Sequence, residues 1–313
     1  MLKRPLLLIC LTLLLLGCAR TPLPQTVLPV VKKTTQTRAV AAYNDVVAEG
    51  RINVSLHTGY AKPQVILRGD PRDLAKVVTI VHNGTLLVSI PNDSPRFGPV
   101  TAEIRTRFLN SFTYKGVGTI TGQRINSSFL DLSITNPGRT IFAGNIYLHK
   151  LDVNGPGYVE INGVKAQNLQ LSINGKARVK LAGYANVSTI NLDGDAWLGL
   201  YWVKSNVLTI RARGHTFLQL GGIVNKLDVE LWDYARFNGR YLRAVRTFAK
   251  THGRSVAEIT ALDRQHTLAT DASNIYFYEI PEMKTDFMAY NGSVLDMRDL
   301  SDPFVEEYTP YNK

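Results

Sequence analysis

The fold is decided by a phrase that recurs along the chain: NGPGYVEI at 154–161, NGKARVKL at 174–181, DGDAWLGL at 193–200 and RGHTFLQL at 213–220. Each copy is a turn that contains Gly, Asn or Asp, followed by apolar residues at alternate positions. An earlier copy, KGVGTI, lies at 115–120, and weaker copies centre on Pro137, Asp233, Gly253, Asp271 and Gly292. The turn therefore recurs about every 20 residues, which is the signature of a repeat architecture.

Apolar residues keep the same phase on both sides of each turn. Four residues after the turn centre stand Ile120, Ile141, Val159, Val179, Leu198, Leu218, Phe237 and Ala257. Four residues before it stand Leu151, Leu171, Ile190, Ile210 and Val229. Alternation with a period of two is typical of strands with one buried face. Each repeat is therefore predicted to run strand, turn, strand, with these residues facing inward.

A repeat of this length with no 3.6-residue periodicity predicts an all-β protein. We expect a parallel β-helix of about ten coils, right-handed, with repeats of about 20 residues over residues 111–300. Each strand then pairs with its equivalent in the next coil, and like residues form ladders. An asparagine ladder is predicted at a second corner, seven or eight residues before successive turn centres, from Asn168, Asn186, Asn206 and Asn225.

Residues 41–110 lack the repeat but keep β-strand patterns. Apolar residues alternate over 52–56, Asp70-Pro71 is typical of a helix start, here over 71–78, and Asn83-Gly84 is typical of a hairpin turn. We expect this β-rich segment to cap or extend the first coils, because an uncapped stack exposes a sheet edge. The tail, residues 301–313, lacks the phrase and is expected to cover the other end.

The first residues form a secretion signal. Lys3 and Arg4 precede an apolar stretch, and LLGC at 15–18 resembles the bacterial lipobox, where cleavage leaves the cysteine carrying diacylglycerol. We assign residues 1–17 to the signal peptide, Cys18 to lipidation and 18–40 to a flexible linker. The alternative is an ordinary cleaved leader with a chance Gly-Cys. Ala19 replaces the Asp that retains Gram-negative lipoproteins in the inner membrane, so the chain is expected to be tethered to the outer membrane, on either side of it.

Basic residues outnumber acidic ones. Removing Lys3 and Arg4 with the leader lowers the formal net charge from +11 to +9, which suits acidic lipids, polysaccharides or other anionic polymers. A basic surface without a partner is the alternative. Nucleic acid is excluded because secretion removes the chain from it and no binding motif is present. The six histidines never stand at ligand spacing, so we expect no metal and no cofactor.

The order of these features resembles the head GIN domain family of bacterial cell-envelope proteins, whose members are labelled auto-transporter adhesins. The likeness rests on EGRINVSL at 49–56, QVILRGD at 64–70, GTLLVSI at 84–90 and the repeated Gly-x-Gly-x-Ile phrases. It covers about residues 41–292. The resemblance implies a β-helical body at the cell envelope and supplies no catalytic residues. This chain departs from it by placing Asp195, His215 and Tyr234 where repeat glycines are usual.

One outward column accompanies the turns. Three residues after the turn centres stand Thr119, Thr140, Tyr158, Arg178, Trp197, Phe217, Arg236 and Val256. Aromatic faces flanked by guanidinium groups suit the stacking of sugars or of a partner's side chains. The candidate binding residues are therefore Tyr158, Arg178, Trp197, Phe217 and Arg236. The alternative is that the tail, with Phe304, Tyr308 and Tyr311, covers this column and makes it core.

A second set of residues raises the question of catalysis. Asp193, Asp195, Arg213 and His215 stand at the turns of adjacent repeats, one repeat after Arg178 and Lys180. A polysaccharide hydrolase needs two carboxylates as acid and base. Pectin-degrading β-helix enzymes carry such a set in a different order, and turn formation explains the acids more simply. The sequence thus favours a lipid-anchored, non-enzymatic, adhesin-like binding module, with a polysaccharide lyase or hydrolase and a structural spacer as alternatives.

Overall fold

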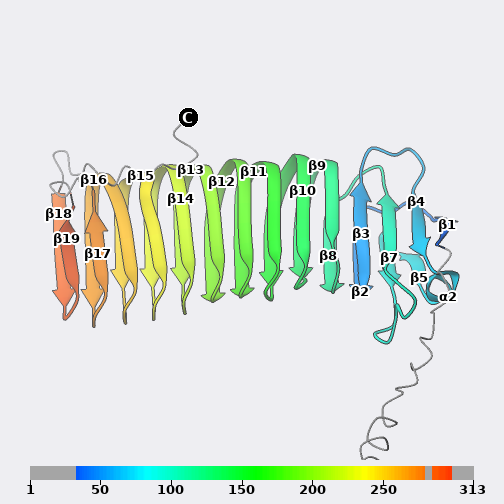
Figure 1. The fold of residues 1–313 in the computed structure, drawn as a ribbon. Helices are drawn as coiled ribbons and strands as arrows, with labels where there is room; N and C mark the ends of the chain where they lie inside the picture. The colour runs from blue at the N-terminus through cyan, green and yellow to red at the C-terminus, as the bar shows by residue number, and fades with distance from the viewer. Residues whose placement is uncertain (1–32, 279–283, 298–313) are drawn as a thin grey trace, which may run out of the picture. The chain divides into compact units, whose positions relative to one another are not determined.

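The structure, a computed structural model, describes residues 33–278 and 284–297. Its core is a row of long strands: β9 (Ile120–Thr135), β10 (Arg139–Asn154), β11 (Tyr158–Gly175), β12 (Arg178–Gly194), β13 (Trp197–Ala212), β14 (Phe217–Leu231), β15 (Arg236–Thr251) and β16 (Val256–Thr270). Each pairs in parallel with the next. The strands therefore stack as a β-solenoid of about nine turns (Figure 1), which confirms the predicted all-β parallel fold.

The last coil is made of shorter strands. β17 (Asn274–Phe277) and β18 (Lys284–Tyr290) both pair in parallel with β16, and β19 (Ser293–Asp296) pairs in parallel with β17. The parallel pairing therefore continues through the weak repeats predicted at Asp271 and Gly292.

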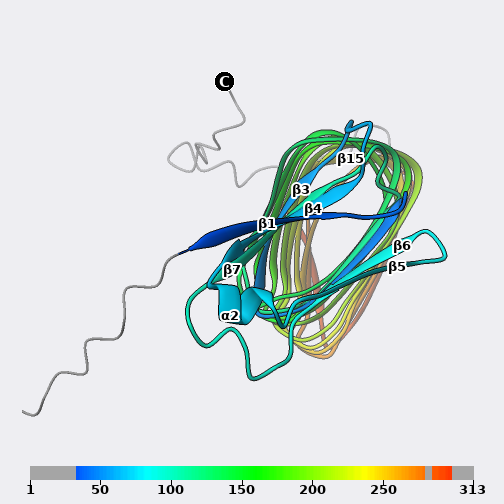
Figure 2. The same ribbon diagram turned by 90° about the vertical axis from the view of Figure 1, so that its right-hand side faces the viewer.

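Every long strand bends at a corner in the middle of its length. In β10 the ladder to β11 shifts register between Ala143 and Ile146, and Gly144 has a φ of 148°. A Cβ on Gly144 would lie 2.0 Å from the carbonyl oxygen of Ile125 in β9, so only glycine allows this approach of two coils. After the corner the strand runs back along the opposite side, and each coil closes around a flattened core (Figure 2).

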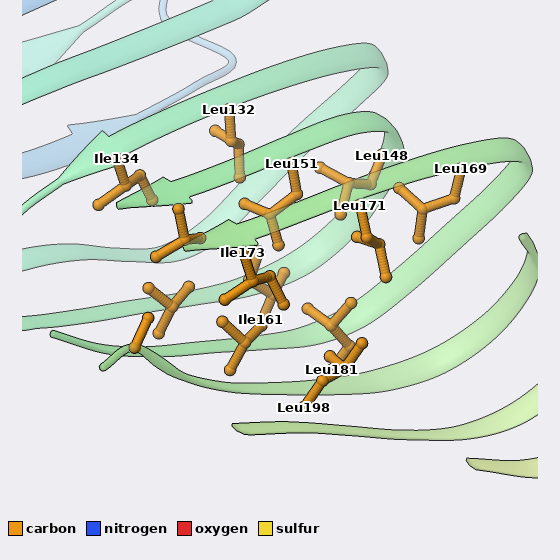
Figure 3. Close-up of a cluster of buried hydrophobic side chains, with 14 of the residues drawn as sticks. Leu132, Ile134, Leu148, Leu151, Ile161, Leu169, Leu171, Ile173, Leu181 and Leu198 are labelled. Atoms are coloured by element: carbon orange, nitrogen blue, oxygen red, sulfur yellow. The ribbon is translucent and has the colours of Figure 1, made fainter. Parts of the chain in front are cut away.

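The core consists of apolar ladders that run from coil to coil. Leu151, Leu171, Ile190, Ile210 and Val229 pair in register and are each at most 1% exposed. Ile161, Leu181 and Leu198 face them from the other side of the core (Figure 3). The predicted inward positions are therefore confirmed in these coils, and truncating one such leucine to alanine is expected to cost about 2–5 kcal/mol.

One coil departs from the predicted phase. Ile141 was expected to face inward, but Thr140 and Phe142 are buried on either side of it, and Thr140 is the partner of both Ile120 and Val159. The turn is centred on Asn136, not on Pro137. The Asn136 amide closes this turn, because its Oδ1 accepts from the backbone N of Gly118 and of Gly138, at 3.2 and 2.9 Å.

Part of the predicted asparagine ladder forms at the corners. Asn225 Nδ2 donates to Asn206 Oδ1 at 3.0 Å. Asn145 pairs with Asn126 in the same way, at 3.2 Å, in coils where no ladder was predicted. These amides bond to one another, so each pair links two neighbouring coils across the corner.

The first coil comes from residues far from the repeats in sequence. β2 (Asp45–Gly50) pairs in parallel with β8 (Ser111–Gly116), and β3 (Ile52–His57) pairs with β7 (Val100–Arg105) and with β9. β4 (Gln64–Gly69) then pairs antiparallel with β7 and with β1 (Thr34–Ala39). These antiparallel strands end the parallel stack at its N-terminal side (Figure 2).

The remaining elements of this segment are a hairpin that pairs with β2 and a short helix that lies against β4. β5 (Val78–His82) and β6 (Thr85–Ser89) form an antiparallel hairpin, and Asn83 and Gly84 have φ values of 48° and 76°. This confirms the hairpin predicted at Asn83-Gly84. The helix α2 (Pro71–Leu74) starts at the predicted place, with Asp70 as N-cap. It is shorter than predicted because the next strand already begins at Val78.

The linker predicted over 18–40 ends earlier than expected. Thr34–Ala39 form β1, a polar and largely exposed strand. It is held by backbone pairing with β4 and by Arg38, whose Nη1 donates to the carbonyl oxygen of Val77 at 2.6 Å and to Thr79 Oγ1 at 2.8 Å. The predicted signal peptide, Cys18, the first part of the predicted linker and the tail lie outside the described residues.

Candidate functional site

Successive coils bring the five candidate binding residues into one row. The register pairs Tyr158 with Arg178, Arg178 with Trp197, Trp197 with Phe217, and Phe217 with Arg236. Arg139 stands before Tyr158 in the same register. Thr140, which was expected in this column, is fully buried, because the turn before it is centred one residue early. We call the row Arg139, Tyr158, Arg178, Trp197, Phe217 and Arg236 the side-face ladder.

The centre of the side-face ladder is an aromatic platform of two nearly parallel rings. A Cβ on Gly199 would lie 2.5 Å from Cη2 of Trp197, so the indole lies down over Gly199. The rings of Trp197 and Phe217 are inclined by only 10°, with centroids 6.5 Å apart. Both side chains are partly exposed. Two nearly parallel rings on neighbouring coils can stack against a sugar ring or a flat side chain.

Charged side chains surround this platform. Arg178 and Arg236, both exposed, lie on either side of the two rings. Near Tyr158, the hydrogen bond from Asn162, with smaller contributions from Tyr158, Lys180 and Arg139, outweighs partial burial and lowers the pKa of Glu160. This carboxylate is therefore ionised near neutral pH and already accepts hydrogen bonds from Tyr158 and Asn162. The guanidinium groups beside the rings remain available to an anionic ligand.

The turn residues that were weighed for catalysis come together only in part. His215 Nδ1 lies 3.7 Å from Asp195 Oδ1, and Lys176 Nζ lies 3.6 Å from Asp195 Oδ2. The His215 ring stacks on Tyr234 with centroids 4.6 Å apart. Asp193 Oδ1 accepts from the backbone N of Gly194 and so stabilises its own turn. Asp195 and His215 are 48% and 66% exposed, so the cluster lies open to water, and its contacts are those of turn formation and charge pairing.

The part of the chain that the structure describes contains neither a metal-binding cluster nor a membrane-spanning helix. Among residues 33–278 and 284–297, no group of three or more His, Cys, Asp and Glu side chains is placed to hold a metal ion. No helix in these ranges has the length and apolar character needed to cross a membrane.

Sequence reasoning missed the aromatic side chains at the second corner of the coils. Tyr184 and Trp202 are 53% and 72% exposed. The signal is Tyr201-Trp202: two adjacent aromatic residues in a strand cannot both face the core, so one of them must point outward. None of the binding residues predicted from the sequence lies at this corner.

These observations define the class of protein: a parallel β-solenoid that carries an exposed ladder of aromatic and guanidinium side chains. Residues 42–216 match the model of the family described as "Putative auto-transporter adhesin, head GIN domain". The chain belongs to this family, which confirms the family resemblance noted in the sequence.

Several solved structures are similar to this chain. One is described as a putative adhesin from Parabacteroides distasonis: it is 15% identical, the match covers 85% of this chain and 98% of that one, and the TM-score is 0.43. A putative adhesin from Parabacteroides merdae is 13% identical, with 85% and 96% covered and a TM-score of 0.43. A putative lipid binding protein from Parabacteroides distasonis is 12% identical, with 84% and 96% covered and a TM-score of 0.45. Comparison with curated proteins gives no match.

Proposed function

We propose that this protein is a lipid-anchored, adhesin-like binding module of the bacterial cell envelope that holds its ligand on the side-face ladder and performs no catalysis. The observation that carries the proposal is the platform formed by Trp197 over Gly199 and by the nearly parallel ring of Phe217. Burial of these rings would be the ordinary outcome in a monomer. Their partial exposure on a regular sheet face supports a surface that meets a partner.

The charge of the surface supports an anionic ligand. Arg178 and Arg236 flank the platform, and the formal net charge without the leader is +9. Guanidinium groups bind carboxylates and phosphates in a bidentate manner. An acidic polysaccharide of the envelope or of a host surface combines flat sugar faces with such groups, and we propose this class of ligand.

The anchor is proposed from the sequence. LLGC at 15–18 supports lipidation of Cys18, and Ala19 supports sorting to the outer membrane. Each buried lipid methylene adds about 0.8 kcal/mol of membrane affinity, so a multiply acylated cysteine holds a protein firmly. The chain belongs to a family whose description names an auto-transporter adhesin, and this membership supports a position at the cell envelope.

The alternatives make different demands on the surface. A polysaccharide-active enzyme would use Asp195 and His215, which lie 3.7 Å apart, yet enzymes usually exclude water from the reacting atoms, and this pair is exposed. A structural spacer would keep its function when the side chains of either site are removed.

The test uses the chain from Ala19 onward, produced without its leader, on an array of bacterial and host glycans. Retained binding and released reducing sugar are recorded for the unchanged protein, Trp197→Ala, Asp195→Asn and the control Phe129→Ala. Phe129 is also exposed, at 45%, but lies outside the side-face ladder. Binding to acidic glycans that is lost only in Trp197→Ala supports the proposal. Sugar release that is abolished in Asp195→Asn would show that the protein is a polysaccharide-active enzyme and would refute the proposal. Absence of both signals would exclude carbohydrate as the ligand class.

A further inference from the structure

A shallow hollow of about 320 Å³ lies at the second corner of the coils, away from the side-face ladder. It spans β11 to β14, and its nine lining residues include Gln167, Tyr184, Asn186, Lys204, Asn206 and Asn225. Four of the nine carry side-chain amides, one carries an ammonium group, and none is acidic. A cationic, amide-rich lining of this kind is suited to a ligand with many hydroxyl groups and a negative charge.

Large aromatic side chains stand beside the hollow. Tyr184 lines it, and on the neighbouring coil Trp202 directly precedes Val203, the partner of Ala185. Trp202 is 72% exposed. Packing among the residues that the structure describes therefore does not explain why a tryptophan occupies the position.

The backbone at Trp202 makes the position more unusual. Its φ is 67°, a conformation that L side chains other than Asn and Asp rarely adopt. Among the described residues, every other non-glycine residue with positive φ is Asn or Asp. At the neighbouring corners Gly183 and Gly222 take the positive φ values instead. A bulky, exposed residue kept in a strained conformation is a pointer to function.

The amides of the hollow retain hydrogen-bonding capacity. Asn225 Nδ2 donates to Asn206 Oδ1 at 3.0 Å, and Ser205 Oγ accepts from the backbone N of Val187 at 2.8 Å. Each side-chain amide has two N–H donors and an oxygen that accepts two hydrogen bonds. One pairing between Asn206 and Asn225 therefore leaves further donors and acceptors on both amides. Vicinal sugar hydroxyls, which both donate and accept, match such a surface.

We propose that this corner hollow is a second glycan site, which binds an acidic sugar unit through three kinds of contact. The amides of Asn186, Asn206 and Asn225 hydrogen-bond the hydroxyls, and the Lys204 ammonium pairs with the sugar carboxylate. The rings of Tyr184 and Trp202 stack on the sugar face. Because the hollow shares no residue with the side-face ladder, this site goes beyond the proposed function and stands or falls independently of it.

The experiment is isothermal titration calorimetry of the chain from Ala19 onward. The probes are oligogalacturonate, a hyaluronan oligosaccharide and sialyllactose, with methyl-esterified oligogalacturonate as the uncharged match. The variants are Trp202→Gly, which keeps a residue suited to the positive φ, Lys204→Gln, which keeps the stem and removes the charge, and Trp197→Ala on the side-face ladder. The far-UV circular dichroism of each variant serves as the folding control.

At least one acidic probe is expected to bind, and Trp202→Gly is expected to weaken that binding tenfold or more. Lys204→Gln is expected to abolish the preference for free over esterified oligogalacturonate. In the Trp197→Ala background, the effects of Trp202→Gly and Lys204→Gln are expected to remain. Any binding that Trp197→Ala itself removes reports separately on the side-face ladder. The proposal is overturned if none of the three acidic sugars binds, or if binding survives both Trp202→Gly and Lys204→Gln in folded protein. Trp202-dependent binding to phosphatidylglycerol vesicles without sugar binding would also overturn it, in favour of a lipid surface.

Discussion

Two glycines of positive φ provide a matched test of how closely the coils approach. Gly144 and Gly155 have φ values of 148° and 98°. A Cβ on Gly155 would meet nothing within 4 Å, whereas a Cβ on Gly144 would lie 2.0 Å from the carbonyl oxygen of Ile125. In both Gly→Ala variants the new side chain disfavours the native backbone conformation. Only in Gly144→Ala would the new Cβ also clash with the neighbouring coil.

The two costs differ in size. Gly155→Ala is expected to destabilise by about 1–2 kcal/mol, which is the cost of a left-handed conformation for an L side chain. In Gly144→Ala the coil must move by about 1 Å before the contact reaches 3.0 Å, the shortest that real Cβ atoms show. That movement weakens two or three ladder hydrogen bonds between β9 and β10, each worth about 1 kcal/mol. The total expected for Gly144→Ala is therefore about 3–5 kcal/mol.

The assay is urea denaturation of both variants, followed by far-UV circular dichroism and supported by thermal melting. At roughly 2–4 °C per kcal/mol for a domain of this size, Gly144→Ala should melt clearly below Gly155→Ala. Equal destabilisation of the two variants would refute the close approach of the coils at Gly144, and with it the stacking register of β9 and β10.

Three further results are expected. Phe142→Ala should destabilise the fold by about 3–5 kcal/mol and Ile141→Ser by less than about 1 kcal/mol in denaturant titrations, because Phe142 faces the core; the reverse order would restore the phase predicted from sequence. Burial alone would raise the pKa of Glu103, but the hydrogen bond and charge of Arg105, together with the charge of a second arginine, lower it. Its contribution to stability is therefore complete above the ordinary glutamate pKa of about 4.3 and is lost as the pH falls through the lower folded-state value. Glu103→Gln should flatten the stability profile in that acidic range, and an unchanged profile would exclude this carboxyl as its source. Cys18→Ser should abolish incorporation of labelled palmitate into the protein in growing cells, and persistent labelling would place the lipid on another residue.

The repeats could be predicted because each coil obeys the same constraint. An inward position must be apolar and alternate with an outward one, so residues such as Leu171 and Ile190 reveal both the period and the phase. The prediction failed at Ile141 because the turn before it is closed by the Asn136 side chain and not by glycine. A turn centre inferred from Pro137 was then displaced by one residue, and one residue reverses the two faces of a strand.

Other features leave a weaker trace in the sequence. β1 is polar on both faces and pairs through its backbone, so Thr34–Ala39 show no apolar alternation that distinguishes them from a linker. The corners contain register shifts, so the period of two does not carry through them, and the exposure of Trp202 could not be read from its place in the repeat. The side-face ladder was predictable because it follows the turn at a constant distance.

The most direct test of the central proposal observes Trp197 itself. The protein contains three tryptophans. The double variant Trp202→Phe, Trp232→Phe leaves Trp197 as the only tryptophan. It also alters the aromatic side chain beside the corner hollow. Titration of this variant with the acidic glycan that the array identifies should change the emission of Trp197 in a saturable manner, with the same affinity as retention on the array. Emission that stays constant while the glycan binds would show that the ligand is held elsewhere and would contradict the side-face ladder as the binding surface.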